Sequence, residues 1–148
     1  PGAGLDVDST GRENIRLRGL YSGLDEAGMR ALEEDAATFS GLGEFLDVPT
    51  RGYSSGMQLR LSFAMTTTMS PQILLMDEWF LAGDADFMAR AEERLVGLVE
   101  GAEILVIATH DENVVRRWCT RVIRLQAGRI VADGPVDAVL GTPQHETT

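Results

Sequence analysis

The stretch from Tyr53 to Glu78, YSSGMQLRLSFAMTTTMSPQILLMDE, decides the expected fold. Residues 57–68 carry apolar side chains at a spacing that is compatible with a helix, and Pro71 prevents that helix from continuing. The run ILLM (73–76) is short and apolar, which is typical of a strand that is covered on both faces. A helix followed by such a strand predicts an α/β fold, in which ligands bind at the carboxyl ends of the strands.

Both ends of this stretch suit phosphate chemistry. Ser54, Ser55 and Gly56 precede the helix, whose first amides lack internal partners, so hydroxyl and N–H groups can bind an anion there. Asp77 and Glu78 follow the strand, where one acid can hold a magnesium ion and a second can orient an attacking water. Each feature alone also has an ordinary interpretation, which is a helix cap in the first case and a solvated strand end in the second.

Composition narrows the classes of function. The net charge of −10 makes a nucleic-acid backbone a poor partner. Every basic residue is arginine, so the chain lacks the lysine that a phosphate-binding P-loop requires. Cys119 is the only cysteine, which excludes an intrachain disulfide and fits a reducing compartment. Without a secretion signal or an apolar run of about 20 residues, the chain is expected to be soluble or peripheral, and its start at proline suggests a piece of a longer protein.

The combined motifs resemble the nucleotide-binding subunit of an ABC transporter. YSSGM (53–57) is similar to the signature motif of that family, and Arg60 follows where the family has an arginine. ILLMDE (73–78) resembles Walker B, which implies that Asp77 is the magnesium-side acid and Glu78 the catalytic base. Asp84 matches the aspartate of the D-loop. His110, at the end of the expected strand 103–109, matches the switch histidine.

The spelling YSSGM, LLMDE and GDADF resembles one branch in particular, the ATPases that export O-antigen, teichoic acid and related polysaccharides. The resemblance covers residues 2–134. It implies an α/β fold of the P-loop NTPase, ABC ATPase type, of which this chain is the C-terminal part, with a helical subdomain and part of the RecA-like sheet core. The expected divisions are a loop at the Q-loop region (1–9), the helical subdomain with the signature motif (10–69), a portion of the RecA-like core (70–140) and a tail (141–148).

Local signals predict the boundaries of several elements. Thr10 and Glu13 have the spacing of a capping box for a helix that runs to Leu20. Asp25 is expected to start a second helix, with the acidic run EED (33–35) as a solvated face and a break at residues 41–43.

The second half of the chain is expected to contain a buried strand, a short helix and a hairpin. The run EILVIA (103–108) predicts the second buried strand, and Asp111 is expected to cap a helix that ends near Cys119. Alternating residues around Ala127-Gly128 predict a β-hairpin that stops at residues 133–135, and residues 136–140 predict a last helical turn.

The resemblance also implies a mechanism. Two subunits of this family close around two ATP molecules, and each site joins the Walker motifs of one subunit to the signature motif of the other. Ser54, Ser55 and Gly56 would then bind the γ-phosphate held by the partner chain, and Asp77 would order the Mg²⁺ shell. Glu78 would polarise the attacking water and His110 would contact the γ-phosphate. Asp84 would shape the dimer interface.

The partners implied are a transmembrane permease and a second nucleotide-binding subunit, with no nucleic acid, at the cytoplasmic side of the plasma membrane. Two alternatives stay open. One is a binding or dimerisation module without hydrolysis, because the chain has no P-loop and is expected to be inactive in isolation. The other is an ABC-type ATPase that works on DNA, which the acidic balance and the absence of coiled-coil heptads disfavour. No glutamine precedes Gln58, although the family has one near the start of this region.

Overall fold

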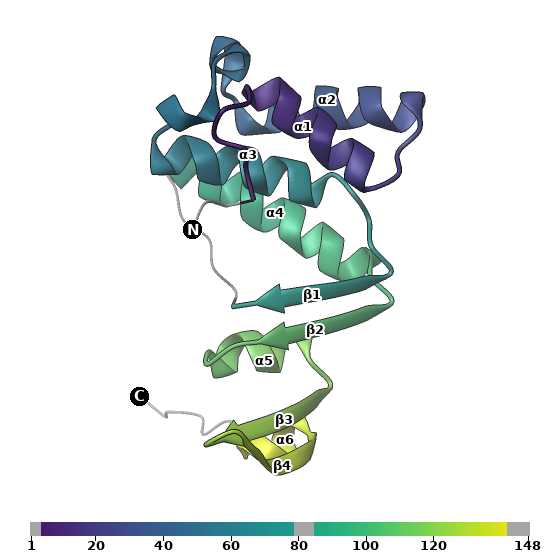
Figure 1. Ribbon diagram of the computed structural model, residues 1–148. Helices are drawn as coiled ribbons and strands as arrows, with labels where there is room; N and C mark the ends of the chain where they lie inside the picture. Colours follow the sequence, from purple (N-terminus) through teal and green to yellow (C-terminus); the bar gives the residue numbers. More distant parts are fainter. Residues whose placement is uncertain (1–3, 79–84, 142–148) are drawn as a thin grey trace. The chain divides into compact units, whose positions relative to one another are not determined.

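The computed structural model describes residues 4–78 and 85–141, and Figure 1 labels their helices and strands. The chain forms two compact units. We call them the helical unit (Pro1–Gln72 with Leu81–Glu103) and the sheet unit (Ile73–Phe80 with Ile104–Thr148).

The helical unit contains four α-helices and two short 3-10 helices in its described part. These are α1 (Gly11–Tyr21), α2 (Glu26–Ser40), η1 (Gly43–Asp47), η2 (Thr50–Gly52), α3 (Ser55–Thr67) and α4 (Ala85–Gly101).

Short-range signals set the ends of these helices. Thr10 and Glu13 form the predicted capping box, in which the Thr10 side chain accepts a hydrogen bond from the Glu13 amide and the Glu13 carboxylate accepts one from the Thr10 amide. Asp25 caps α2 by accepting from the Gly28 amide. Gly41 ends α2 with a φ of 63°, in the left-handed region that glycine adopts without strain. The predicted start of the second helix and its break near residue 41 are therefore confirmed.

The core of the helical unit lies among α1, α2, η1 and α3. Its buried apolar residues are Ile15, Leu32, Ala36, Leu42, Leu46, Tyr53, Leu61, Ala64 and Met65. On α3, the buried side chains include the three apolar residues 61, 64 and 65, whose spacing places them on one face of the helix. Packing of this face, more than helix propensity, holds the unit together.

The acidic run 33–35 is only in part the solvated face that the sequence predicted, since Glu34 is exposed but Glu33 and Asp35 are half-buried. Glu33 accepts a hydrogen bond from Arg16 of α1 at 2.5 Å. Asp35 lies half-buried and binds both terminal nitrogens of Arg94 in α4, at 2.6 and 2.8 Å. The prediction failed for Asp35 because Arg94 lies 59 positions away in the chain, beyond the reach of any local pattern.

The described part of the sheet unit contains two two-stranded sheets. β1 (Ile73–Asp77) pairs in parallel with β2 (Ile104–Ala108), in a register that places Ile73 beside Ile104. β3 (Arg121–Gln126) pairs with β4 (Arg129–Pro135) in an antiparallel hairpin. Two short helices, α5 (Glu112–Trp118) and α6 (Val136–Leu140), accompany them.

Two predictions about these strands are wrong. Strands β1 and β2 are not buried on both faces, because four of their apolar residues are exposed: Ile73, Leu75, Ile104 and Val106. Their exposed fractions lie between 51% and 71%, so the described residues leave that face of the sheet largely uncovered. Strand β4 also continues through residues 133–135, where the sequence predicted a stop, because Arg121 pairs with Pro135 across the hairpin.

The predicted hairpin turn, the α5 cap and the last helical turn are confirmed. Ala127 and Gly128 have φ values of 48° and 73°, which are typical of the turn that joins two twisted strands tightly. Asp111 caps α5 by accepting from the Asn113 amide. Helix α4 belongs to the helical unit, although the sequence grouped it with residues 70–140, and the domain boundaries stay a prediction.

Candidate active site

The carboxyl ends of β1 and β2 bring together the acid and the histidine that the sequence singled out. Parallel pairing aligns Asp77 with Ala108, so the residues that follow each strand emerge at the same edge. The Glu78 amide donates a hydrogen bond to the Ala108 carbonyl at 2.7 Å, which extends the pairing by one step.

Glu78 is held by two side chains from the segment after β2. Its Oε1 lies 2.9 Å from Nδ1 of His110, and its Oε2 accepts a hydrogen bond from the Thr109 hydroxyl at 3.1 Å. The Thr109 oxygen in turn accepts from the Asp111 amide at 3.1 Å. This arrangement orients the Glu78 carboxylate through both of its oxygens.

The backbone of Glu78 adopts a conformation that residues other than glycine rarely adopt. Its φ is 68°, in the left-handed region. Such conformations persist only where the surroundings enforce them, and they concentrate at functional sites. Here Glu78 is held in place by the hydrogen bond from its amide to the Ala108 carbonyl and by the two contacts of its carboxylate.

The same contacts change how both groups titrate. The hydrogen bond from His110, with a further one from Thr109, holds the pKa of Glu78 below its usual value. The hydrogen bond to Glu78, together with its negative charge, raises the pKa of His110. Because the side chains are 43% and 90% exposed, water screens this pair strongly. A carboxylate that stays ionised is what a group that orients water requires.

Asp77 is the candidate magnesium ligand. Asp77 is an exposed residue at the end of β1, directly before Glu78. The described residues contain no cluster of three acidic, histidine or cysteine ligands. The exposed carboxylate of Asp77 fits Mg²⁺ bound through one carboxylate together with water and substrate phosphates, which is the usual arrangement in nucleotide enzymes. Asp77 therefore fits the ion that the sequence implied.

The predicted phosphate-binding turn lies in the helical unit, at the start of α3. Ser54 caps this helix by accepting from the Met57 amide at 3.2 Å, and Ser54, Ser55 and Gly56 are all exposed. A Cβ added at Gly56 would meet only the Ser54 hydroxyl, at 3.9 Å. Packing within the chain therefore does not require glycine here, and the open backbone is available to a ligand. Tyr53, in contrast, is buried and donates to the Phe45 carbonyl, so it serves packing.

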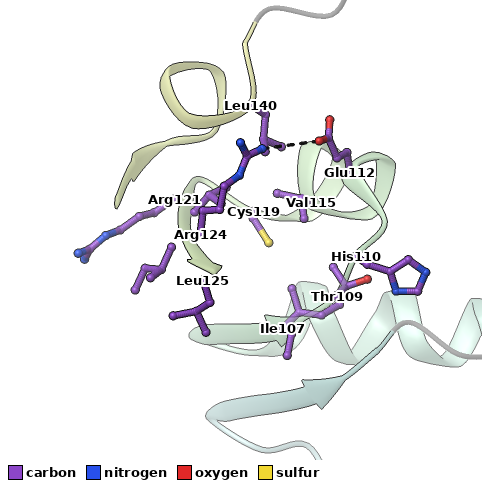
Figure 2. Close-up of a pocket in the computed structure, with 13 residues that line it drawn as sticks. Ile107, Thr109, His110, Glu112, Val115, Cys119, Arg121, Arg124, Leu125 and Leu140 are labelled. Carbon is purple, nitrogen blue, oxygen red and sulfur yellow. Dashed lines mark ion pairs between the residues drawn. The ribbon is translucent and has the colours of Figure 1, made fainter. Parts of the chain in front are cut away.

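A cavity of about 440 Å³ lies near His110 in the sheet unit (Figure 2). It is lined by residues of β2, α5 and the hairpin, and Glu112 and Arg124 form an ion pair at its edge. Glu78 is not among its lining residues. Cys119 lines it, but burial raises the pKa of this thiol, which disfavours the reactive thiolate. The cavity therefore has His110 and Thr109 in its lining but not Glu78, the candidate base.

The structure places most of the predicted site residues, in two groups. Asp77, Glu78 and His110 lie in the sheet unit, where Glu78 and His110 are in contact. Ser54, Ser55 and Gly56 lie in the helical unit, and Asp84 falls outside the described residues. Thr109 was missed as a site residue. The sequence could have indicated Thr109 by its position just before His110 at a strand end. Only the pairing of β1 with β2, however, shows that the Thr109 hydroxyl reaches Glu78.

Sequence comparison finds similar proteins of polysaccharide export. The O-antigen export system ATP-binding protein RfbE of Yersinia enterocolitica is 43% identical over 129 residues, which cover 87% of this chain and 54% of that protein. The teichoic acids export ATP-binding protein TagH of Lactococcus lactis is 33% identical, over 97% of this chain and 30% of that protein. The chain thus spans about half the length of the first of these relatives and less of the second. No family model matches it.

Structure comparison leads to the same fold. A solved ATP-binding subunit of an ABC transporter superposes with a TM-score of 0.70 at 27% identity, covering 91% of this chain and 56% of that one. An ATP-binding cassette solved as a dimer after hydrolysis, with ADP and Pi bound, has a TM-score of 0.64 at 23% identity, covering 90% and 60%. This second likeness supports the fold alone. No helix in residues 4–78 or 85–141 is both long and apolar enough to cross a bilayer.

Proposed function

Because the chain belongs to the ATP-binding proteins of ABC transporters, we propose that it is the signature and Walker B portion of a subunit that hydrolyses ATP to drive polysaccharide export. The observation that carries the proposal is the Glu78 carboxylate, held by His110 and Thr109 at the carboxyl ends of two parallel strands. This edge is where α/β sheets bind their ligands.

Glu78 is the general base in this proposal. Its carboxylate is fixed by two side-chain contacts, an orientation that suits it to polarise a water that attacks the γ-phosphate. His110, at 2.9 Å from Glu78, orients the base, and its exposed ring is available to contact a phosphate. Bound Mg²⁺ would neutralise charge on the phosphates, and Asp77 is the residue that would hold it.

The exposed turn of Ser54, Ser55 and Gly56 is the second half of the proposed chemistry. Its hydroxyls and the free amides of the first turn of α3 are suited to bind a γ-phosphate. We assign this turn to the nucleotide of a partner subunit, as in the family that the sequence resembles. Asp84 is proposed to shape that dimer interface. A homodimer of such subunits, bound to a transmembrane permease at the cytoplasmic side of the membrane, is the assembly proposed.

Polysaccharide is the proposed cargo because the relatives that are 43% and 33% identical carry O-antigen and teichoic acid export in their names. The 148-residue chain by itself is proposed to be inactive. It has no lysine, so it lacks the side chain that reaches the β and γ phosphates in P-loop proteins. A binding module without hydrolysis is the alternative that this absence leaves for the isolated chain.

Turnover by a Glu78→Gln variant tests the proposal. In an intact subunit that carries these residues, we expect kcat to fall by about 10² to 10⁴, which is the usual contribution of a general base. Mg-ATP binding, measured by calorimetry, should remain because the amide keeps the shape of the site. Glu44→Gln, at an exposed position of η1, is the matched control and should behave like the wild type. Normal turnover in Glu78→Gln would contradict the assignment of the base.

The isolated chain offers a second test. We expect no Mg-ATP binding to the 148 residues alone and binding after a segment with a P-loop is added. Tight binding to the chain alone would show that it holds nucleotide without a P-loop, and the proposed division of the site would be wrong.

A further inference from the structure

Three phenylalanines from three helices meet in the helical unit. Phe39 of α2 and Phe63 of α3 stack at a centroid distance of 5.7 Å. Phe87, in the first turn of α4, meets both rings edge to face, at 5.7 and 5.9 Å. Phe87 is 1% exposed, so this ring is enclosed. Aromatic pairs at such distances and angles stabilise the contact beyond simple burial of area.

Arg60 joins this cluster to the first turns of α3. Its guanidinium carbon lies 5.4 Å from the centroid of the Phe87 ring. Arg60 follows Gly56 by four residues on the same helix, so it stands about one turn beyond the predicted phosphate-binding turn. A guanidinium over an aromatic face is attractive, and the planar group stacks better than an ammonium.

A second attachment holds the later turns of α4. Arg94 binds Asp35 of α2 through two hydrogen bonds, and its guanidinium carbon lies 3.8 Å from the centroid of Phe39. The Thr68 hydroxyl, just after α3, donates to the same Asp35 carboxylate at 2.6 Å. Because this contact fixes α4 on α2, the Phe87 ring is a fixed packing partner for Arg60 of α3.

We propose that Arg60 is a positioning residue that acts through Phe87 and sets the placement of Ser54, Ser55 and Gly56. Its side chain anchors the start of α3 to the aromatic cluster, and the phosphate itself is contacted by the turn. This inference rests on the proposed function, since it concerns the same phosphate-binding turn. A misplacement of about 1 Å in a catalytic group can reduce turnover by as much as 10²-fold, so an anchor one turn away affects rate.

The test is a double-mutant cycle on ATP turnover in an intact subunit. We expect Arg60→Met and Phe87→Leu each to reduce kcat by about tenfold, with the KM for ATP unchanged, because only placement of the turn is disturbed. The double variant should be no slower than the slower single variant, because both changes remove one interaction. Arg30→Met is the matched control. Arg30 pairs with Glu26 on the exposed surface of α2, outside the aromatic cluster, and this variant should turn over like the wild type.

Arg60→Lys provides a variant with little risk to folding. It keeps a positive charge that could reach a phosphate but loses the planar group that stacks on Phe87, so kcat should fall as in Arg60→Met. Wild-type turnover in Arg60→Lys, or effects of Arg60→Met and Phe87→Leu that multiply, would overturn the inference and indicate a direct contact of Arg60 with the nucleotide. A wild-type subunit without ATP turnover would instead overturn the proposed function, and with it this inference.

Discussion

The helical unit and the sheet unit bury their apolar residues to very different extents. Every buried apolar side chain in the described residues belongs to the helical unit, from Ile15 in α1 to Leu95 in α4. The described strands of the sheet unit instead expose eight large apolar residues: Ile73, Leu75, Ile104, Val106, Ile123, Leu125, Ile130 and Val131. The sheet unit nevertheless holds the carboxylate and imidazole that suit catalysis. The buried apolar core and the proposed general base thus lie in different units of the chain.

Truncation of one leucine in each unit tests this contrast, and it carries the largest expected effect on stability. Leu61 is 0% exposed and Leu75 is 71% exposed. Leu61→Ala should lower the free energy of unfolding by about 2 to 5 kcal/mol, because it leaves a cavity in the core. Leu75→Ala should change it by less than about 0.5 kcal/mol, as for other surface substitutions. Urea unfolding of the 148-residue chain measures both.

Equal losses of unfolding free energy in the two leucine variants would contradict the difference between the units, since they would show that Leu75 is covered in solution. The same two variants can also be compared in a longer protein that contains this chain. If additional chain covers the exposed face of β1, Leu75→Ala should become costly there while the effect of Leu61→Ala stays the same.

The contact between Asp35 and Arg94 predicts a smaller effect inside the helical unit. Asp35→Asn should lower the free energy of unfolding by about 1 to 2 kcal/mol at neutral pH, because it weakens a charged, two-point hydrogen bond that is partly shielded from water. Glu26→Gln is the matched control on the same helix. Its pair with Arg30 is exposed, so the change should be below about 0.5 kcal/mol.

The pH dependence of this effect follows from the direction of the pKa shift. Burial opposes ionisation of Asp35, but hydrogen bonds from Arg94 and Thr68 outweigh it and hold the pKa of Asp35 below its usual value of 3.8. A lowered pKa adds stability above the unfolded value, and that stability is lost as the pH falls through the folded value. The difference between wild type and Asp35→Asn should therefore shrink below pH 3.8. A difference that is constant with pH would contradict the ion pair.

The sequence predicted features that depend on near neighbours better than features that depend on distant ones. The caps at Thr10, Asp25 and Asp111 were readable because each donor amide lies two or three residues away. The fold class was predicted from the residues of the motifs, and the comparisons confirm that fold class. The exposure of β1 and the partner of Asp35 were not readable, because both depend on which segments pack together far along the chain. The candidate site shows the same limit, since Glu78 and His110 were named from sequence but the Thr109 contact was not.

The smallest predicted effect, a change in the titration of His110, tests the sheet unit directly. The contact with Glu78 raises the pKa of His110 from its usual 6.5 and lowers that of Glu78 from 4.5. A raised histidine pKa stabilises the fold below pH 6.5 and loses that contribution as the pH rises through the folded value. A lowered carboxylate pKa stabilises it above pH 4.5 and loses that contribution as the pH falls. The two groups therefore attract one another most strongly between these limits.

NMR titration of the imidazole measures the effect. In Glu78→Gln the pKa of His110 should fall toward its usual value, because the amide cannot supply the negative charge. Thr109→Val is the control, since it removes only the hydroxyl that reaches the other oxygen of Glu78 and should shift His110 less. A His145→Gln background leaves His110 as the sole histidine and makes the signal unambiguous. An unchanged His110 titration in Glu78→Gln would mean that the two side chains are not in contact in solution, and His110 could then not act by orienting the base.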